Sequence, residues 1–178
     1  MIIQLCGLSG AGKSTLAQHA KAELEAQSIP VEIIDGDDYR RHISKDLGFS
    51  REDRMENIRR LGFIGNKFSQ HGIVAIICAI NPYDAVRKEL KKSYAAVFTA
   101  YVKCDLEELI RRDTKGLYKR ALLPEDHQDK INNLSGMGDP FEEVNDADLV
   151  IRTDKEPVQD SVKKLTEFIR NKRVEKMR

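Results

Sequence analysis

One short stretch near the start of the chain combines glycines, a lysine and hydroxyl side chains at the spacing that phosphate binding requires. Residues 7–14 read Gly-Leu-Ser-Gly-Ala-Gly-Lys-Ser, which fits GxxxxGK[ST] without exception. Glycines let the backbone turn with positive φ and bring successive N–H groups close to phosphate oxygens. The residues expected to contact the nucleotide are therefore those of this loop: Gly7, Ser9, Gly10, Ala11, Gly12, Lys13, Ser14 and Thr15.

Two side chains of this loop have predicted chemical roles. Lys13 is expected to reach the β- and γ-phosphates of ATP and to act in catalysis, and the Ser14 hydroxyl is expected to ligate Mg²⁺. The motif is informative when it lies between a buried strand and a helix. The apolar run Ile2–Cys6 precedes it, and apolar residues recur every four positions in 16–24. The sequence thus predicts a P-loop with ATP and Mg²⁺ as cofactors.

Features of a GTPase are incomplete. A guanine-reading NKxD motif is not matched by residues 66–69, Asn-Lys-Phe-Ser, because the aspartate is missing. Residues 113–116 match DxxG, but they follow a charged helical stretch and not an apolar strand. A kinase that transfers the γ-phosphoryl group to a small acceptor is the favoured interpretation.

A pair of acidic residues follows the second apolar run. Asp35 and Asp37 flank Gly36 directly after this run. The carboxyl ends of neighbouring parallel strands share one crevice, so these acids are expected to face the P-loop. Asp35 is predicted to support the Mg²⁺ shell, and Asp37 to orient an acceptor hydroxyl and take its proton. An acidic helix cap on a solvated surface is the alternative, and Asp-Gly-Asp alone does not decide between them.

The remaining pattern alternates short apolar runs with amphipathic stretches, which predicts a single doubly wound α/β domain over residues 1–178. It has a mainly parallel five-stranded sheet with helices on both faces. A long helix is expected over Arg51–Gln70, with Ser50 and Asp53 as a capping box, and Pro82 and Pro157 are expected at the first positions of two other helices. The predicted strands are Ile2–Cys6, Val31–Ile34, Ile73–Cys78, Val97–Lys103 and Asp148–Arg152.

Residues 122–146 form an irregular segment rich in polar residues, glycine and proline, and a lid is expected over about residues 115–146. A long irregular segment in a compact domain is more often a functional lid than a defect, with disorder as the alternative.

Composition narrows the class of protein. The chain has 178 residues, 30 basic and 29 acidic, for a net charge of +1, so no global basic field indicates nucleic-acid binding. No window approaches membrane-spanning length. The three cysteines lack a CxxC pair and are interpreted as buried thiols. We expect a cytoplasmic protein with a small nucleotide substrate and neither a nucleic-acid nor a membrane partner.

Residues 46–60, Asp-Leu-Gly-Phe-Ser-Arg-Glu-Asp-Arg-Met-Glu-Asn-Ile-Arg-Arg, strongly resemble the signature of adenylylsulfate (APS) kinases. These enzymes phosphorylate the 3′-hydroxyl of adenosine 5′-phosphosulfate to give 3′-phosphoadenylylsulfate, a step of sulfate assimilation. The P-loop, the turn 35–37 and residues 112–118 resemble further pieces of the family in the same order, over about the first two thirds of the chain. The resemblance implies an ATP-dependent kinase that forms a homodimer.

The resemblance also implies roles for single residues. Two of them, Arg54 and Asn57, lie three apart on one predicted helix face, and a guanidinium suits an oxyanion. Phe49 would stack on the acceptor's adenine, although a plain hydrophobic anchor explains it equally well. Arg112 would approach the ATP phosphates, and Thr153 falls where related kinases wrap the ATP adenine. The implied acceptor-binding residues are Asp35, Asp37, Arg40, Phe49, Arg54, Asn57, Ile80, Lys115 and Leu134.

Departures from the family occur in motifs assigned to the acceptor. The usual Ile-Ser-Pro-Tyr-Arg reads Ile-Asn-Pro-Tyr-Asp at 80–84, and the lid motif Phe-Thr-Gly-Ile-Asp reads Leu-Ser-Gly-Met-Gly at 134–138. Leu134 cannot stack as the second aromatic face of an adenine sandwich. A divergent APS kinase is favoured. A kinase for another nucleotide's ribose, such as a cytidine diphosphate derivative, is the alternative. A non-catalytic nucleotide-binding regulator is disfavoured because Lys13, Ser14, Asp35 and Asp37 are all intact.

Overall fold

The computed structural model describes residues 1–177, and its centre is a sheet of five parallel strands. The strand order is β2-β3-β1-β4-β5, and each neighbouring pair is parallel. Because β3 and β4 lie on either side of β1, the carboxyl end of β1 opens into the crevice where such sheets bind ligands. The strands are β1 (Ile2–Cys6), β2 (Val31–Asp35), β3 (Val74–Cys78), β4 (Val97–Lys103) and β5 (Leu149–Arg152).

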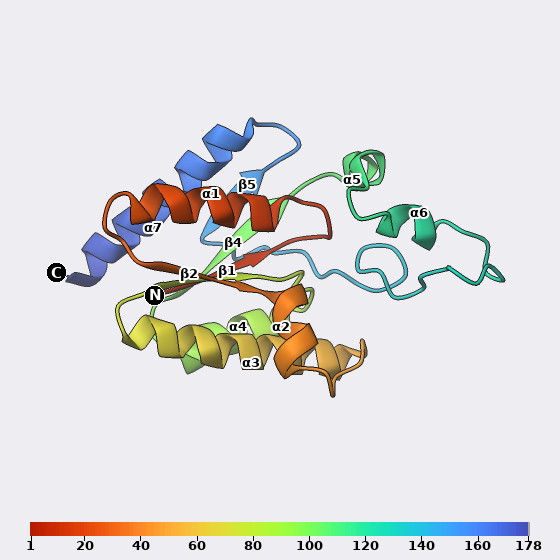
Figure 1. Cartoon of the computed structure of the whole chain (residues 1–178), viewed down its shortest axis with the longest axis horizontal. Helices are drawn as coiled ribbons and strands as arrows, with labels where there is room; N and C mark the ends of the chain where they lie inside the picture. Colours follow the sequence, from red (N-terminus) through yellow and green to blue (C-terminus); the bar gives the residue numbers. More distant parts are fainter. Residues whose placement is uncertain (178) are drawn as a thin grey trace.

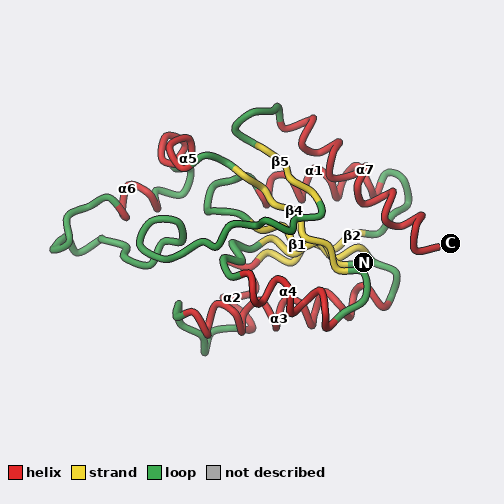
Figure 2. The backbone as a smooth tube through the Cα atoms, turned by 180° about the vertical axis from the view of Figure 1, so that it is seen from behind, coloured by secondary structure: helices red, strands yellow, loops and turns green. Residues whose placement is uncertain are grey.

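Helices cover both faces of this sheet, as Figures 1 and 2 show from opposite sides. One face carries α1 (Lys13–Glu25) and α7 (Val158–Met177), and the other carries α2 (Gly36–Ile43), α3 (Arg51–Gln70) and α4 (Asp84–Ser93). The short helices α5 (Leu106–Arg112) and α6 (Leu117–Ala121) lie beyond the carboxyl ends of the strands. The predicted doubly wound α/β domain is confirmed. None of the helices within residues 1–177 combines the length and the apolar character that crossing a membrane requires.

The alternation of β1 side chains divides the core into two layers. Ile3 and Leu5 point to the layer that contains Leu24 of α1, whereas Ile2 belongs to the layer that contains Leu61 of α3 and Leu90 of α4. All six side chains are buried. Each fully buried aliphatic side chain contributes roughly 1.5–3 kcal/mol relative to an exposed one, so both layers hold the site's elements firmly against the sheet.

Most predicted boundaries agree with the structure. The bounds of β1, β4 and α3 are confirmed, and the Ser50 hydroxyl caps α3 by accepting a bond of 3.1 Å from the Asp53 amide. The two proline predictions are wrong. Pro82 precedes Tyr83, whose extended backbone (φ −108°, ψ 127°) separates it from α4. Pro157 lies just before α7, where its carbonyl accepts the first helical bond from Ser161.

Residues 122–146 contain no helix or strand, as expected from their composition. Part of the segment is nevertheless held by backbone bonds. The Leu134 carbonyl accepts from the Gly138 and Asp139 amides, at 3.0 and 3.1 Å, and the Asp139 carbonyl accepts from the Gly136 amide at 2.7 Å. These bonds form a closed loop that ends beside α3.

Candidate active site

The P-loop lies between β1 and α1, as its motif requires. Gly7, Gly10 and Gly12 have φ of 151°, 76° and 93°, and residues other than glycine rarely adopt such backbone conformations. A Cβ at Gly7 would also lie 2.3 Å from the carbonyl oxygen of Val102 on β4. The glycine is therefore needed at the first position for both its backbone conformation and its close approach to the neighbouring strand.

Lys13 folds back over the loop that carries it. Its Nζ donates to the carbonyl oxygens of Gly7 and Leu8, at 2.7 and 2.8 Å. Burial of the ammonium lowers the pKa of Lys13 to about 8. A charge that has lost part of its hydration is stabilised strongly by phosphate oxygens, so the side chain is prepared for a triphosphate.

Asp35 caps α2, which was the alternative reading of its sequence, and it also contacts the P-loop. One carboxylate oxygen accepts from the amides of Asp37 and Asp38, at 2.9 and 3.3 Å, and so caps α2. The other oxygen accepts from the Ser14 hydroxyl at 2.9 Å. Hydroxyl and carboxylate oxygens are suitable ligands for Mg²⁺. Over residues 1–177 there is no cluster of three or more His, Cys, Asp or Glu side chains suited to a metal, so Mg²⁺ held here would take its other ligands from phosphate and water.

Two adjoining cavities meet at the carboxyl edge of the sheet. The P-loop cavity, of about 430 Å³, contains Lys13 and Ser14, and the acceptor cavity, of about 460 Å³, contains Arg40 and Asn57. The residues that line both cavities are Asp37, Phe49, Arg54, Ala79 and Ile80. A nucleotide in each cavity would therefore meet its partner at Asp37.

The Asp37 carboxylate is exposed and accepts a 2.7 Å bond from the Lys115 ammonium, on the segment between α5 and α6. This ion pair links two predicted site residues that lie 78 positions apart in the sequence. It keeps a cation beside the carboxylate that is predicted to take the acceptor's proton.

The acceptor cavity is rich in positive charge. Burial, and then repulsion by Arg54, lower the pKa of Arg40. The Arg40 Nη1 donates to the carbonyl oxygens of Leu47 and Gly48, at 3.3 and 2.6 Å, which holds the guanidinium in place. Two guanidinium groups kept close together are typical of a site for an anionic group.

Arg54 connects the acceptor cavity to the irregular segment, which the sequence reasoning missed. Its Nη2 donates to the Asn133 carbonyl at 2.6 Å and to the Asp139 carboxylate at 2.8 Å, and its Nε donates to the Phe49 carbonyl at 3.0 Å. The Phe49 side chain is half exposed, and both Arg40 and Arg54 lie over its ring, at 4.7 and 5.4 Å from the centroid. Among residues 1–177, Arg54 Nη1 has no hydrogen-bond partner, so it is left for a bound acceptor.

Three buried polar atoms at the wall of the acceptor cavity have no hydrogen-bond partner among the described residues: Ser44 Oγ, Asn57 Oδ1 and Asn81 Oδ1. Asn57 was predicted to bind the acceptor, whereas Ser44 and Asn81 were not. A buried polar group without a partner is costly, so such atoms mark a wall that water or a ligand completes.

The remaining predicted residues lie around the P-loop. Leu134 is buried and lines the P-loop cavity together with Phe49, but not the acceptor cavity. The Thr153 hydroxyl donates to the Ala11 carbonyl at 3.0 Å, and the Arg112 Nη2 donates to the Thr153 carbonyl at 2.9 Å. Arg112 and Thr153 line neither of the two cavities. In this structure Thr153 bonds to the P-loop from outside the cavities, and Arg112 bonds to Thr153.

Asp84, which replaces the family's usual arginine, was expected to belong to the acceptor site with the rest of residues 80–84, but the structure places it elsewhere. Asp84 begins α4 and pairs with the Lys88 ammonium at 2.6 Å, and it does not line the acceptor cavity. An acidic residue in the first turn interacts favourably with the positive end of the helix dipole, which explains its presence here.

The fold and the site together define a P-loop kinase: a strand–loop–helix phosphate site beside a second cavity, with a carboxylate where the two meet. A shikimate kinase from Aquifex aeolicus, 15% identical with a TM-score of 0.53 over 98% of this chain and 99% of its own, shares this fold. The chain matches the family model for adenylylsulphate kinase over residues 1–152 and belongs to that family, whose members are phosphotransferases acting on a hydroxyl group.

Known relatives agree with this assignment. An adenylyl-sulfate kinase from Microcystis aeruginosa is 40% identical over 163 residues, which cover 92% of this chain and 87% of the relative. A probable bifunctional SAT/APS kinase from Sorangium cellulosum is 42% identical over 164 residues, and the chain spans 27% of its length. The APS kinase CysC of Mycobacterium tuberculosis, solved with AMPPNP and APS, has a TM-score of 0.88 at 28% identity, over 95% of this chain and 96% of its own.

Proposed function

We propose how this chain's residues carry out the ATP-dependent phosphorylation of adenylyl sulfate to 3′-phosphoadenylyl sulfate, the activity that its family membership supports. The observation that supports the proposal most directly is the position of Asp37 at the junction of two cavities. One of these cavities contains the P-loop and the other is rich in arginine. The structure of the related Mycobacterium tuberculosis kinase contains a nucleotide of each kind, AMPPNP and APS.

On the donor side, the P-loop amides and Lys13 hold the β- and γ-phosphates of ATP. The Lys13 ammonium exchanges its bonds to the Gly7 and Leu8 carbonyls for phosphate oxygens. Ser14, with Asp35 behind it at 2.9 Å, would hold Mg²⁺. When bound, Mg²⁺ neutralises charge on the β- and γ-phosphates.

On the acceptor side, Asp37 orients the 3′-hydroxyl and accepts its proton as the hydroxyl oxygen bonds to the γ-phosphorus. The bond between that phosphorus and the bridging oxygen breaks, and ADP leaves. Lys115, 2.7 Å from Asp37, holds the carboxylate in place. The residues that we assign to binding of the phosphosulfate, ribose and adenine are Arg40, Phe49, Arg54, Asn57, Ile80 and Leu134.

We propose that the segment 115–146 acts as a lid over the acceptor. Asp139 holds the Arg54 guanidinium at 2.8 Å in this structure. The acceptor's anionic group competes for the same guanidinium, so acceptor binding and the position of this segment are coupled.

The resemblance to APS kinases also supports a homodimer, and the three free, buried cysteines are consistent with a reducing cytoplasm. A related APS kinase from Thiobacillus denitrificans, 26% identical with a TM-score of 0.68, is described as hexameric, and this chain covers 28% of it. Light scattering at micromolar concentration distinguishes monomer, dimer and hexamer.

The activity is tested by offering the purified protein adenylyl sulfate and a set of cytidine and uridine diphosphate derivatives side by side, with ATP and Mg²⁺. We expect the highest kcat/KM for adenylyl sulfate. A pyrimidine acceptor preferred by about a hundredfold would show that the altered lid motif selects another base. Absence of any single-turnover transfer from labelled ATP would support a regulator without catalysis.

A further inference from the structure

Arg87 is a buried charged side chain to which the proposed reaction gives no role. It lies on α4 with 1% of its surface exposed, and it lines neither cavity. Its one carboxylate neighbour among the described ion pairs is Asp84, at 3.6 Å. A guanidinium without a close counterion is costly to bury unless other acceptors satisfy its N–H groups. The positions of the groups that accept hydrogen bonds from Arg87 therefore indicate what a buried charge does at this position.

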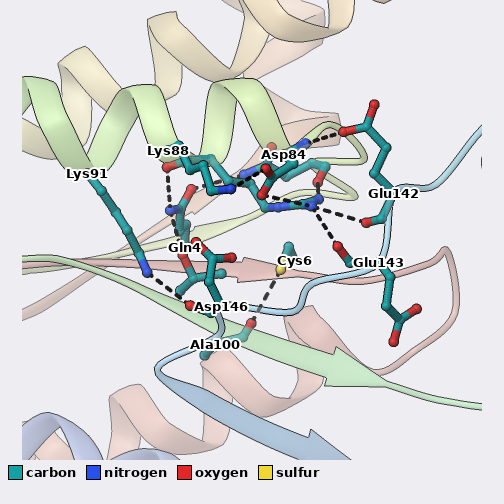
Figure 3. A network of polar contacts seen from close by, with 12 residues as sticks. Gln4, Cys6, Asp84, Lys88, Lys91, Ala100, Glu142, Glu143 and Asp146 are labelled. Atoms are coloured by element: carbon teal, nitrogen blue, oxygen red, sulfur yellow. Dashed lines mark hydrogen bonds and ion pairs between the residues drawn. The ribbon is translucent and has the colours of Figure 1, made fainter.

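The hydrogen-bond acceptors for the Arg87 guanidinium are backbone carbonyls from two distant parts of the chain. Nη1 donates to the Asn81 carbonyl at 2.9 Å, and Nη2 donates to the carbonyls of Glu142 and Glu143 at 3.1 and 3.2 Å. Figure 3 shows Glu142 and Glu143 on the strand-free stretch that passes beside α4. One side chain thus joins the turn after β3 to the end of the irregular segment 122–146.

Asn81 is held on its other side as well. Its φ is 48°, and its Nδ2 donates to the Gln4 side-chain oxygen on β1 at 3.0 Å. The Gln4 amide donates in turn to the Thr99 hydroxyl on β4, at 2.8 Å, and to the Arg87 carbonyl at 3.1 Å. These groups are all buried, and such a network specifies one arrangement of the backbone that it connects.

The turn held by this network forms part of the site. Ile80, Asn81 and Pro82 line the acceptor cavity, and Ile80 lines the P-loop cavity too. The Ile80 carbonyl accepts from the amide of Gly7, the first P-loop glycine, at 3.1 Å. A continuous path of bonded groups therefore runs from residues 142–143 through Arg87 and the turn to the P-loop.

We propose that Arg87 is a positioning residue for the acceptor. It fixes the turn 80–82, and with it the cavity wall, to the point where the segment 115–146 rejoins the sheet. Without the bonds from the Arg87 guanidinium the turn is free to shift. The acceptor cavity then loses this part of its wall, while most P-loop contacts to ATP remain. The identity of the acceptor used in the kinetic test rests on the proposed function.

The kinetic test compares Arg87→Met and Arg87→Lys with the matched control Arg59→Met. Arg59 forms two bonds to Glu89 of α4, at 2.7 and 3.0 Å, and lines neither cavity. For Arg87→Met we expect the KM for adenylyl sulfate to rise about tenfold, with kcat and the KM for ATP within about twofold of wild type. Arg87→Lys should show a smaller rise in the same KM. Arg59→Met should match wild type.

The second test is hydrogen–deuterium exchange of the ligand-free proteins, which needs no acceptor. Faster exchange confined to residues 79–83 and 141–145 in Arg87→Lys, with β1 unchanged, is the expected result. Faster exchange throughout the sheet, or equal losses for both substrates, would overturn the proposal in favour of a general stabilising role. Wild-type exchange and an unchanged acceptor KM in Arg87→Lys would also overturn it, even if Arg87→Met does not fold. Should wild type not phosphorylate adenylyl sulfate, the proposed function fails and the exchange result alone decides the role of Arg87.

Discussion

We expect binding of the transferred phosphoryl group to depend most directly on Lys13, since its ammonium lies within the P-loop that would hold the triphosphate. We expect Lys13→Ala to abolish phosphoryl transfer and to leave the fold intact. Loss of a charge-assisted contact in a preorganised site costs on the order of 3 kcal/mol or more. Turnover and circular dichroism should be measured on the same preparation. Near-wild-type activity in the folded variant would contradict the kinase mechanism.

The half-buried position of Lys13 also predicts a pH dependence. Burial lowers its pKa to about 8, whereas bound phosphates raise that pKa by stabilising the charged form. Above pH 8 the free enzyme has lost this proton and must regain it to bind ATP in the same way. The affinity for ATP should therefore fall as pH rises through about 8. Calorimetric titrations of wild type at several pH values test this, and Lys13→Ala should lack this part of the slope.

Asp37 is predicted to act on the acceptor hydroxyl and not on ATP. Asp37→Asn should lower kcat far more than it raises the KM for ATP, because an amide cannot take the proton. Its exposed ion pair with Lys115 contributes little to stability, so the unfolding midpoint should hardly change. Steady-state kinetics with each substrate varied provide the measurement. A collapse of ATP affinity with kcat preserved would instead place Asp37 in the metal shell.

For single residues, the sequence predicts contacts between residues that are close along the chain and misses contacts between residues that are far apart along it. The P-loop is a contiguous motif, and its residues lie together as expected. The bond from Arg54 to Asp139 joins residues 85 positions apart, and the one from Asn81 to Gln4 joins residues 77 apart. No spacing rule relates such pairs, since the fold alone brings them together.

Among the elements, periodicity and capping predict whole strands and helices better than single prolines predict their first residues. The α3 boundary follows from Ser50 and a repeating apolar face. Pro82 and Pro157 are equally compatible with the positions just before a helix, which is where the structure places them. The irregular segment 122–146 was recognised by composition, but composition does not predict its internal bonds.

The loop that backbone bonds close at residues 134–139, within this segment, depends on Gly138. A Cβ at this position would lie 1.8 Å from the Asn132 carbonyl oxygen, so Gly138→Ala must displace the backbone next to Asp139. Since Asp139 holds Arg54, we expect a higher KM for the acceptor with the KM for ATP little changed. Gly65→Ala is the matched control, because a Cβ there meets its neighbours at ordinary distances of 3.4–3.5 Å. Equal acceptor KM values in the two variants would contradict this role of the loop.

For the molecule as a whole, alternating apolar runs and amphipathic stretches were sufficient to predict the doubly wound domain. The order β2-β3-β1-β4-β5 was not predicted, because it depends on which strand edges meet after the helices have packed. The meeting of the two cavities at Asp37 follows from that order, since β2 and β3 place their carboxyl ends beside the P-loop. The general crevice was therefore predictable, and its shape was not.

The choice of acceptor base would involve distant parts of the chain, because Phe49 and Leu134, the residues we assign to the base, lie just before α3 and in the irregular segment 122–146. Leu134 and Phe49 line the same cavity, and a stacked aromatic residue is worth roughly 1–3 kcal/mol per base. Leu134→Phe should therefore lower the KM for adenylyl sulfate by about tenfold with little change in kcat. Leu134→Met is the matched control, because it keeps the volume without an aromatic ring.

Leu134 is 6% exposed, so a larger side chain also has a cost. Overpacking of a buried position destabilises by about 1–3 kcal/mol, which a urea titration of each variant measures. A lower KM in Leu134→Phe alone would show that the family's usual phenylalanine at this position completes the adenine site. An unchanged or higher KM, with a loss of stability in Leu134→Phe, would show that this chain has filled the position with core packing and binds the adenine through Phe49 without a second ring.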